Sequence, residues 1–417
     1  MNRADKLNED LKQKHPAALR CLSPLGQRLY FPQGVPVQAA QAKNCQFNAT
    51  IGQLQDDFGH ASPLPSMARH VSGVSIEEVF QYQAQGGRQD LRQLWKERIL
   101  QEVSCENIST PVVCMGLTHG LSIAADLFVD QNTDVLMPDP RWGNYDLIFG
   151  VRRLGNIINY KVMDGEGEQP SRWSFNISGI ARAIAKIRHK GMLVLNIPSN
   201  PVGYTPNFSE VQQLVEVIKG ATKPLTIVLD EAYKGMEWED EILKHSLIQE
   251  LSTLDPEKFL VIKIDGATKE MFFFGGRIAF VTFVCSPDVA EILEEKAIGA
   301  IRSTVSALPS PSQALTIKAL QSPTLVSETA AIREMLRERY SVLKELLIQS
   351  PLQNWQYNSA FFTLVSAPNG AEETRLRLIE KGVGVVSVPS VNSIRLSYST
   401  VPKEDLEPMI RIIERNI

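Results

Sequence analysis

Long apolar runs are missing from this chain of 417 residues. No stretch approaches the roughly 20 consecutive apolar residues that a membrane-spanning helix needs, and the polar N-terminal region has no apolar signal-peptide core. Basic runs are also missing, and the formal net charge of −4 argues against a nucleic-acid-binding protein. The 43% hydrophobic and 22% charged residues are typical of a soluble globular protein. We therefore expect a cytoplasmic protein that has neither membrane nor nucleic-acid partners.

Cysteine is scarce, and its five copies are scattered along the chain. An odd, scattered set does not predict a disulfide framework and fits a reducing compartment. No two cysteines stand at metal-ligand spacing, and the six histidines form neither an HExxH nor an HxH pattern. We therefore expect no metal site. A nicotinamide dehydrogenase is also disfavoured, because no GxGxxG motif follows a predicted strand.

The chain is too long for a single ordinary core, which predicts two or three domains. From about residue 111, short apolar runs alternate with helical segments, and a second, smaller domain is expected from about Thr324. Near-continuous apolar strands that alternate with helices predict an α/β fold whose mostly parallel sheet is covered on both faces. The predicted strands lie at 111–116, 134–138, 192–198, 225–230, 259–264 and 276–284.

Ligands of such sheets bind at the carboxyl ends of the strands, where this sequence places Thr118, Asn200, Asp230 and Lys269. A lysine beside an apolar run can be desolvated, which lowers its pKa and makes it a nucleophile. Asp230 ends an apolar strand and needs a positive partner, either a protonated pyridine or a structural salt bridge.

A phosphate site is predicted as well. Residues 116–120 lie where a helix would begin after a strand, and Arg277 follows Lys269 by eight residues. An amine-reactive lysine, a carboxylate for a pyridinium and a phosphate site together point to pyridoxal 5′-phosphate.

Six segments, in order along the chain, resemble the motifs of the class I aminotransferases of the fold-type-I pyridoxal-phosphate enzymes. The similarity is greatest to the aspartate/aromatic branch, and it spans most of the sequence. The resemblance implies a large cofactor domain at 66–320 and a small domain made of 1–65 and 321–417. The segments are YQAQGG (82–87), DPRWGNY (139–145), NIPSNPVGYTP (196–206), DEAY (230–233), TKEMFFFGGR (268–277) and SIRLSYS (393–399).

The resemblance implies a catalytic role for Lys269, Asp230 and Tyr233. Lys269 would bond to the cofactor and then move the proton, and Asp230 would keep the pyridine nitrogen protonated. Tyr233 and Asn200 would hydrogen-bond the ring oxygen, and Trp142 would stack on the ring. The enzyme would transfer an amino group from an amino acid to a 2-oxo acid, through the pyridoxamine form of the cofactor.

By the same resemblance, Leu117, Thr118, His119 and Arg277 would hold the phosphate. Tyr82 would reach the phosphate of the neighbouring subunit, which implies a homodimer with composite sites. His119 is unusual in this turn, and a role at the start of the helix is the favoured alternative.

The remaining implied roles concern the substrate. Arg395 would clamp the α-carboxylate, assisted by Asn200 and Trp142, and Gly52 would pass close by. Arg302 would bind the distal carboxylate of a dicarboxylic substrate across the dimer, or would be a solvent-facing arginine at a helix end. Aspartate or an aromatic amino acid is the favoured donor, with 2-oxoglutarate as acceptor.

Three departures from the family pattern stand near these residues. Tyr145 replaces a histidine, Gly266 replaces a phosphate-binding serine or threonine, and Ala279 replaces a glycine. Thr268 is expected to supply the lost phosphate contact. Rival activities are a C–S lyase or decarboxylase that uses the same cofactor, or a non-catalytic ligand-binding homologue.

Overall fold

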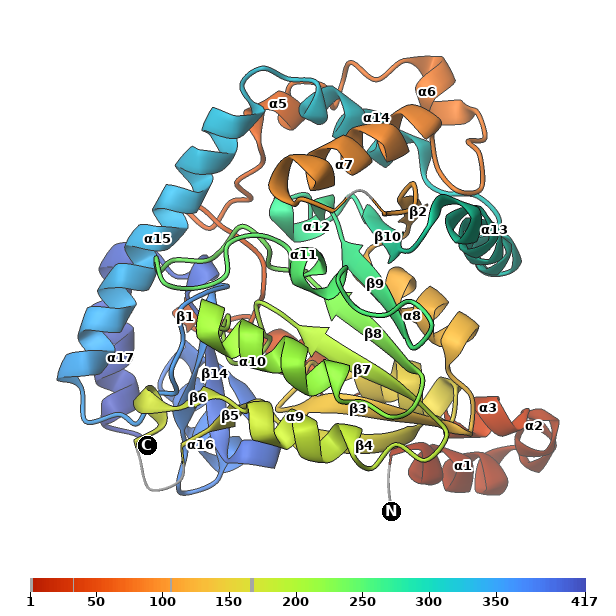
Figure 1. Cartoon of the computed structure of the whole chain (residues 1–417). Helices are drawn as coiled ribbons and strands as arrows, with labels where there is room; N and C mark the ends of the chain where they lie inside the picture. The colour runs from red at the N-terminus through yellow and green to blue at the C-terminus, as the bar shows by residue number, and fades with distance from the viewer. Residues whose placement is uncertain (1–2, 33, 106, 166–168) are drawn as a thin grey trace.

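A seven-stranded sheet forms the centre of the molecule in a computed structural model that describes residues 3–32, 34–105, 107–165 and 169–417 (Figure 1). Its order is β2-β10-β9-β8-β7-β3-β4. Only β10 runs antiparallel to its neighbours. The strands are β2 (Val112–Cys114), β10 (Ala279–Val284), β9 (Phe259–Asp265), β8 (Leu225–Asp230), β7 (Lys190–Asn196), β3 (Thr133–Asp139) and β4 (Asn156–Lys161).

Helices cover both faces of this sheet. Alternate side chains of each strand point to opposite sides, so each face carries side chains that pack against a helix. Ile264 of β9 faces helix α8 (Leu117–Phe128), where a Cβ atom on Gly120 would lie 3.0 Å from its Cγ2. On the other side, Phe280 of β10 stacks on Trp95 of α7 (Gln89–Glu102), with ring centroids 4.2 Å apart. Helices α7 and α8 therefore lie on opposite faces of β9 and β10.

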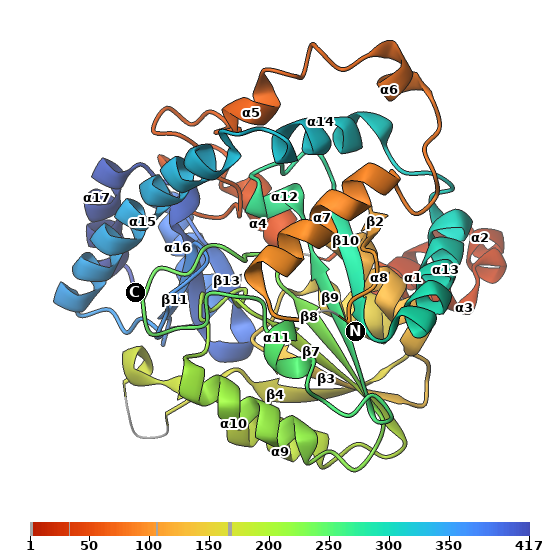
Figure 2. The ribbon, with the colours of Figure 1, turned by 45° about the horizontal axis from the view of Figure 1, so that its top comes forward.

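The other helices of the large part of the molecule surround this sheet (Figures 1 and 2). Helices α9 and α10 pack together near β3 and β4, and α13 packs on α8. These helices are α5 (Pro65–Ala68), α6 (Ile76–Phe80), α9 (Ile177–Ile184), α10 (Phe208–Lys219), α11 (Ile248–Leu251), α12 (Ala267–Glu270), α13 (Pro287–Thr304) and α14 (Ser310–Leu320), with the π-helix η1 (Asp146–Arg152), the 3₁₀ turn η2 (Pro170–Arg172) and a small hairpin of β5 (Met163–Asp164) and β6 (Ser174–Phe175).

A smaller unit of three antiparallel strands and three helices follows in the chain. The N-terminal segment joins it, since the backbone amides of Ser397 and Gln55 donate to the carbonyls of Ala49 and Ser399. The elements are α4 (Val35–Gln41), β1 (Phe47–Asn48), α15 (Leu325–Gln349), β11 (Phe362–Ser366), α16 (Ala371–Glu380), β12 (Val383–Gly384), β13 (Val386–Val388), η3 (Pro389–Val391), β14 (Ser393–Ser397), η4 (Tyr398–Thr400), η5 (Lys403–Asp405) and α17 (Leu406–Glu414).

The first three helices lie apart from this smaller unit (Figures 1 and 2). They are α1 (Arg3–Lys14), α2 (Pro16–Cys21) and α3 (Pro24–Arg28). Helix α3 packs on η1, and Arg28 Nε donates to the carbonyl of Val151 at 3.2 Å. The domain boundaries at 65/66 and 320/321 stay a prediction. Helix α3, which was predicted to belong to the small domain, contacts η1 of the large part.

The predicted α/β class with a mostly parallel sheet is confirmed. Strand β4 was not predicted, because its sequence NIINYK lies at the sheet edge and carries polar residues. The predicted run at 276–284 forms a strand only from Ala279. Among the described helices, none combines the length and apolar character needed to cross a bilayer.

Candidate active site

The carboxyl ends of the central strands open onto a cavity of about 210 Å³. Parallel strands that end at one edge bring residues far apart in sequence together here. Eight predicted residues line this cavity, together with Asn196, Ala232 and Thr268: Leu117, Thr118, Trp142, Asn200, Asp230, Tyr233, Lys269 and Arg277.

Lys269 lies on α12, a single helical turn that directly follows β9. Its Nζ lies 5.2 Å from the ring centroid of Tyr233. Burial lowers the pKa of the Lys269 amine to about 8, although the nearby Asp230 carboxylate opposes this shift. A lysine with such a pKa is partly neutral near neutral pH, and the neutral amine is the nucleophilic form.

Asp230 ends β8 and is 4% exposed. The hydroxyl of the buried Tyr145 donates to its Oδ2 at 2.5 Å, and the amide of Ala232 donates to Oδ1 at 3.2 Å. Burial raises the pKa of Asp230, whereas the Tyr145 hydrogen bond acts in the opposite direction. Tyr145, which takes the place of the usual histidine, therefore supports the charged carboxylate as a neutral donor. Its role as the partner of Asp230 was missed from the sequence.

Asn200 links the large part of the molecule to the small unit. Its Nδ2 donates to the Tyr233 hydroxyl at 3.2 Å, and its Oδ1 accepts from Arg395 Nη1 at 3.1 Å. Arg395, on β14, also donates from Nη2 to the carbonyl of Thr50 at 2.6 Å. Within the described part of the chain its buried Nε has no hydrogen-bond partner. Burial lowers the pKa of Arg395 to about 10, so this cation stays protonated at neutral pH.

An anion cradle lies where α8 begins. Gly116 precedes the helix with φ 77°, and a Cβ atom there would lie only 2.2 Å from Arg277 Nη2. Glycine thus provides both the left-handed backbone and the close approach of the guanidinium. The exposed amides at a helix N-terminus and a neighbouring arginine together favour a phosphate.

Both ring nitrogens of His119 have hydrogen-bond partners, and Nε2 lies 3.3 Å from Thr304 Oγ1 at the end of α13. Its Nδ1 accepts from the amide of Met115 at 3.1 Å, and its own amide donates to the carbonyl of Gly116 at 3.0 Å. Burial lowers the pKa of the imidazole, which favours the neutral ring that accepts this bond. These contacts favour the role at the start of the helix over the predicted cofactor contact.

Two departures from the family pattern prove to be neighbours. A Cβ atom on Gly266 would lie 2.4 Å from the Cα of Ala279 and 2.8 Å from its Cβ. A serine or threonine at 266 would therefore clash with β10. Thr268, which lines the cavity, donates its hydroxyl to the carbonyl of Ile278 at 3.1 Å.

Besides His119 and Arg395, whose contacts are given above, three further predicted residues are not among those that line the cavity of a single chain. Gly52 packs on Phe362, whose Cζ would lie 3.3 Å from a Cβ atom at 52. The side chain of Tyr82 is 93% exposed. Arg302 is also exposed, and its Nη1 donates to Ser306 Oγ at 2.7 Å. Tyr82 and Arg302 can take part in a site only if a second copy of the chain brings them to it.

A desolvated lysine, a buried carboxylate and an anion cradle at the strand ends of such a sheet define the class of fold-type-I pyridoxal-phosphate enzymes. The family described as Aminotransferase class I and II matches residues 46–413. The chain belongs to this family and is a pyridoxal-phosphate-dependent transaminase, as predicted.

Individual relatives agree with this assignment. The aspartate aminotransferase of Bacillus subtilis is 25% identical over 380 residues, which cover 86% of this chain and 91% of the relative. That of Sulfurisphaera tokodaii is 25% identical over 388 residues, 88% of this chain and 90% of the relative. Among solved structures, an aminotransferase from Anaerococcus prevotii superposes with a TM-score of 0.83 at 20% identity, covering 93% and 98% of the two chains. An aspartate aminotransferase from Thermus thermophilus, solved with maleate, gives 0.75 at 21% identity over 95% and 99%.

Proposed function

We propose that this transaminase uses glutamate and 2-oxoglutarate as one substrate pair, and aspartate or an aromatic amino acid with its 2-oxo acid as the other. The observation that carries the proposal is the convergence of Lys269, Asp230 and Asn200 at one cavity, with Arg395 hydrogen-bonded to Asn200. The names of the curated relatives support aspartate, and the Thermus enzyme was solved with maleate, itself a dicarboxylate.

The residues present fit pyridoxal phosphate. Asp230 is a buried carboxylate that needs a cation on its cavity side, as a protonated pyridine nitrogen would supply. The start of α8 and Arg277 offer a site for the phosphate, and Trp142 offers an aromatic face. When bound, the cofactor supplies an electron sink for the pair that is released when the substrate α-carbon loses its proton.

The chain's own residues supply binding and proton transfer. Arg395 and Asn200 would hold the substrate α-carboxylate. The Nε of Arg395, which has no hydrogen-bond partner among the described residues, is a donor available for this purpose. The Lys269 amine would take the proton from the substrate α-carbon and deliver it to the cofactor carbon that is to carry the amino group, the 1,3-proton shift that transfers that group. Since Arg395 comes from the small unit, closure of that unit would complete the site and exclude water.

A substrate panel tests this function. The enzyme, supplied with pyridoxal phosphate, is incubated with each amino acid and 2-oxoglutarate, and the new 2-oxo acid and glutamate are measured. Aspartate or an aromatic amino acid should give both products in equal amounts. Pyruvate and ammonia from cysteine without an acceptor, or carbon dioxide release, would instead favour the lyase or decarboxylase.

We further propose a homodimer in which Tyr82 contacts the cofactor phosphate of the neighbouring subunit. Tyr82→Phe should loosen the cofactor. Mixing Tyr82→Phe chains with Lys269→Ala chains should yield heterodimers in which one site carries both changes and the other neither. The measurements are the activity and the cofactor affinity of isolated heterodimers. One of the two sites in each heterodimer should behave as in the wild-type protein. Heterodimers without such a site would contradict the composite arrangement.

Arg302 is proposed to bind the distal carboxylate of dicarboxylic substrates across the same interface. A charge-assisted pair of this kind contributes about 1.5–3 kcal/mol, so Arg302→Ala should lower kcat/KM for dicarboxylates by roughly tenfold to a hundredfold. Monocarboxylic substrates should be nearly unaffected. Equal losses for both substrate classes would make Arg302 structural.

A further inference from the structure

The turn that carries Lys269 cannot be stable by itself. Helix α12 has only four residues, and no side chain of the described residues caps its N-terminus. So short a helix depends on tertiary contacts. Phe272, which follows it, has φ 54°, a left-handed conformation that the surroundings must enforce. What fixes this turn therefore fixes the position of the Lys269 amine.

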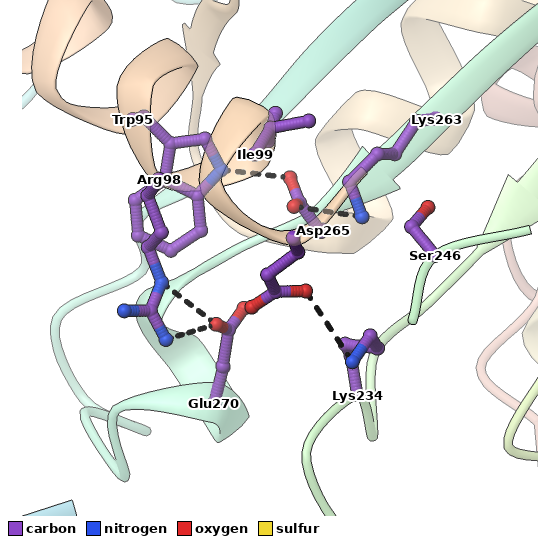
Figure 3. Close-up of a pocket in the computed structure, with 9 residues that line it drawn as sticks. Trp95, Arg98, Ile99, Lys234, Ser246, Lys263, Asp265 and Glu270 are labelled. Atoms are coloured by element: carbon purple, nitrogen blue, oxygen red, sulfur yellow. Dashed lines mark hydrogen bonds and ion pairs between the residues drawn. The ribbon is translucent and has the colours of Figure 1, made fainter. Parts of the chain in front are cut away.

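Glu270, the next residue, anchors the turn from the side opposite the cavity. Its Oε1 accepts from Arg98 Nε at 2.9 Å and from Nη2 at 2.5 Å, and its side chain is 6% exposed (Figure 3). Arg98 stands on α7, which covers the sheet face remote from α8. Two hydrogen bonds from one rigid guanidinium to a desolvated carboxylate restrict both position and orientation.

The same arrangement recurs beside Asp230. Glu231, the next residue, pairs with Lys263, whose Nζ lies 3.0 Å from Asp265 Oδ2. Trp95 of α7 donates its Nε1 to Asp265 at 3.0 Å (Figure 3). These charged groups are nearly inaccessible to solvent.

Tyr233 follows the pattern as well. Lys234, the next residue, is buried, and its Nζ lies 3.4 Å from Glu102 at the end of α7. Each of the three predicted catalytic residues thus faces the cavity, and its successor in the chain is tied into a buried ionic network beneath α7. The Glu270–Arg98 pair is the member of this network closest in sequence to the reactive amine.

We propose that Glu270, held by Arg98, is the positioning residue that sets the Lys269 amine for condensation with the cofactor aldehyde, in which a C=N bond would form and the aldehyde oxygen would leave as water. This inference rests on the proposed function. Displacements of about 1 Å can slow a well-oriented reaction by about a hundredfold. Loss of the Glu270–Arg98 pair should therefore slow the covalent binding of the cofactor to Lys269 without weakening its non-covalent binding in the cavity.

The test measures how fast the cofactor-free protein captures pyridoxal phosphate covalently, followed by absorbance. Glu270→Gln and Arg98→Met should each slow capture tenfold or more, and the double variant should match the single ones, because all three remove the same pair. Affinity for 4′-deoxypyridoxine 5′-phosphate, which has no aldehyde, should stay within about twofold of wild type on the same additivity grounds. The unfolding temperature of each cofactor-free variant is recorded alongside.

Glu294→Gln is the matched control. It breaks a comparable ion pair, Arg92 Nη2 to Glu294 Oε2 at 2.6 Å, which joins α7 to α13 away from Lys269. Glu294→Gln should lower the unfolding temperature of the protein and leave the rate of covalent cofactor capture at the wild-type value. Capture by Glu270→Gln at the wild-type rate, or slowed no more than in Glu294→Gln, would overturn the inference. So would an equal loss of affinity for the deoxy analogue, which would mean that the network shapes the whole cavity. If the wild-type protein itself fails to capture pyridoxal phosphate, the proposed function fails instead.

Discussion

Lys269→Ala is expected to abolish transamination while the fold stays intact. In the proposed mechanism the amine forms the bond to the cofactor and transfers the proton at the substrate α-carbon. Positioned acid–base catalysis alone contributes up to about 10⁴-fold, so turnover should fall by at least that factor. The measurement is 2-oxo acid formation by the variant, together with the unfolding temperature of the cofactor-free protein.

Lys258→Ala is the control for this variant, because Lys258 is an exposed lysine just before β9. It should retain wild-type turnover. The unfolding temperature of Lys269→Ala should not fall, since removal of a lysine whose pKa is depressed by burial relieves a desolvation cost. Substantial activity in Lys269→Ala would contradict the assignment of this residue.

Asp230→Asn should show the second-largest effect. An amide cannot stabilise a protonated pyridine nitrogen as a carboxylate does, so the electron sink weakens while the phosphate contacts remain. Loss of one preorganised electrostatic contact costs roughly 10²–10³-fold in kcat. We expect a loss at least this large, with cofactor affinity reduced much less. The measurements are kcat and the dissociation constant for pyridoxal phosphate.

Tyr145→Phe provides a graded comparison for Asp230→Asn. It removes the 2.5 Å hydrogen bond to Asp230 but keeps the carboxylate, so its loss of kcat should be smaller. Near-normal turnover in Asp230→Asn would show that Asp230 is a structural residue only.

The fold and most of the cavity could be predicted because the information is local. Strands such as Leu225–Asp230 read as continuous apolar runs, since both faces of a parallel sheet are buried. The residues that follow such a run lie at the carboxyl end of the strand, where ligands of parallel sheets bind. This rule predicted that Asn200, Asp230 and Lys269 lie at one edge of the sheet.

Features that depend on distant partners could not be predicted. Lys263 and Asp265 look like solvent-facing charges in a strand sequence, but they are buried because Glu231 and Trp95 come to them from other elements. Tyr145 was noticed only as a departure from the family. Its function depends on a hydrogen bond to a residue 85 positions away.

The lack of room for a side chain at Gly266 is a further case, because it depends on how β10 approaches the end of β9. In the sequence these residues are two independent departures from the family. Only the packed strands show that the backbone of Ile278 and Ala279 leaves no room for a side chain at position 266.

Borohydride reduction of the enzyme with bound pyridoxal phosphate, followed by peptide mapping, tests the central claim most directly. Reduction fixes the cofactor to the amine that holds it. The account predicts a single labelled peptide, with the modification on Lys269, and no label in Lys269→Ala. Label on any other lysine, such as the buried Lys234 or Lys263, would contradict the proposed active site.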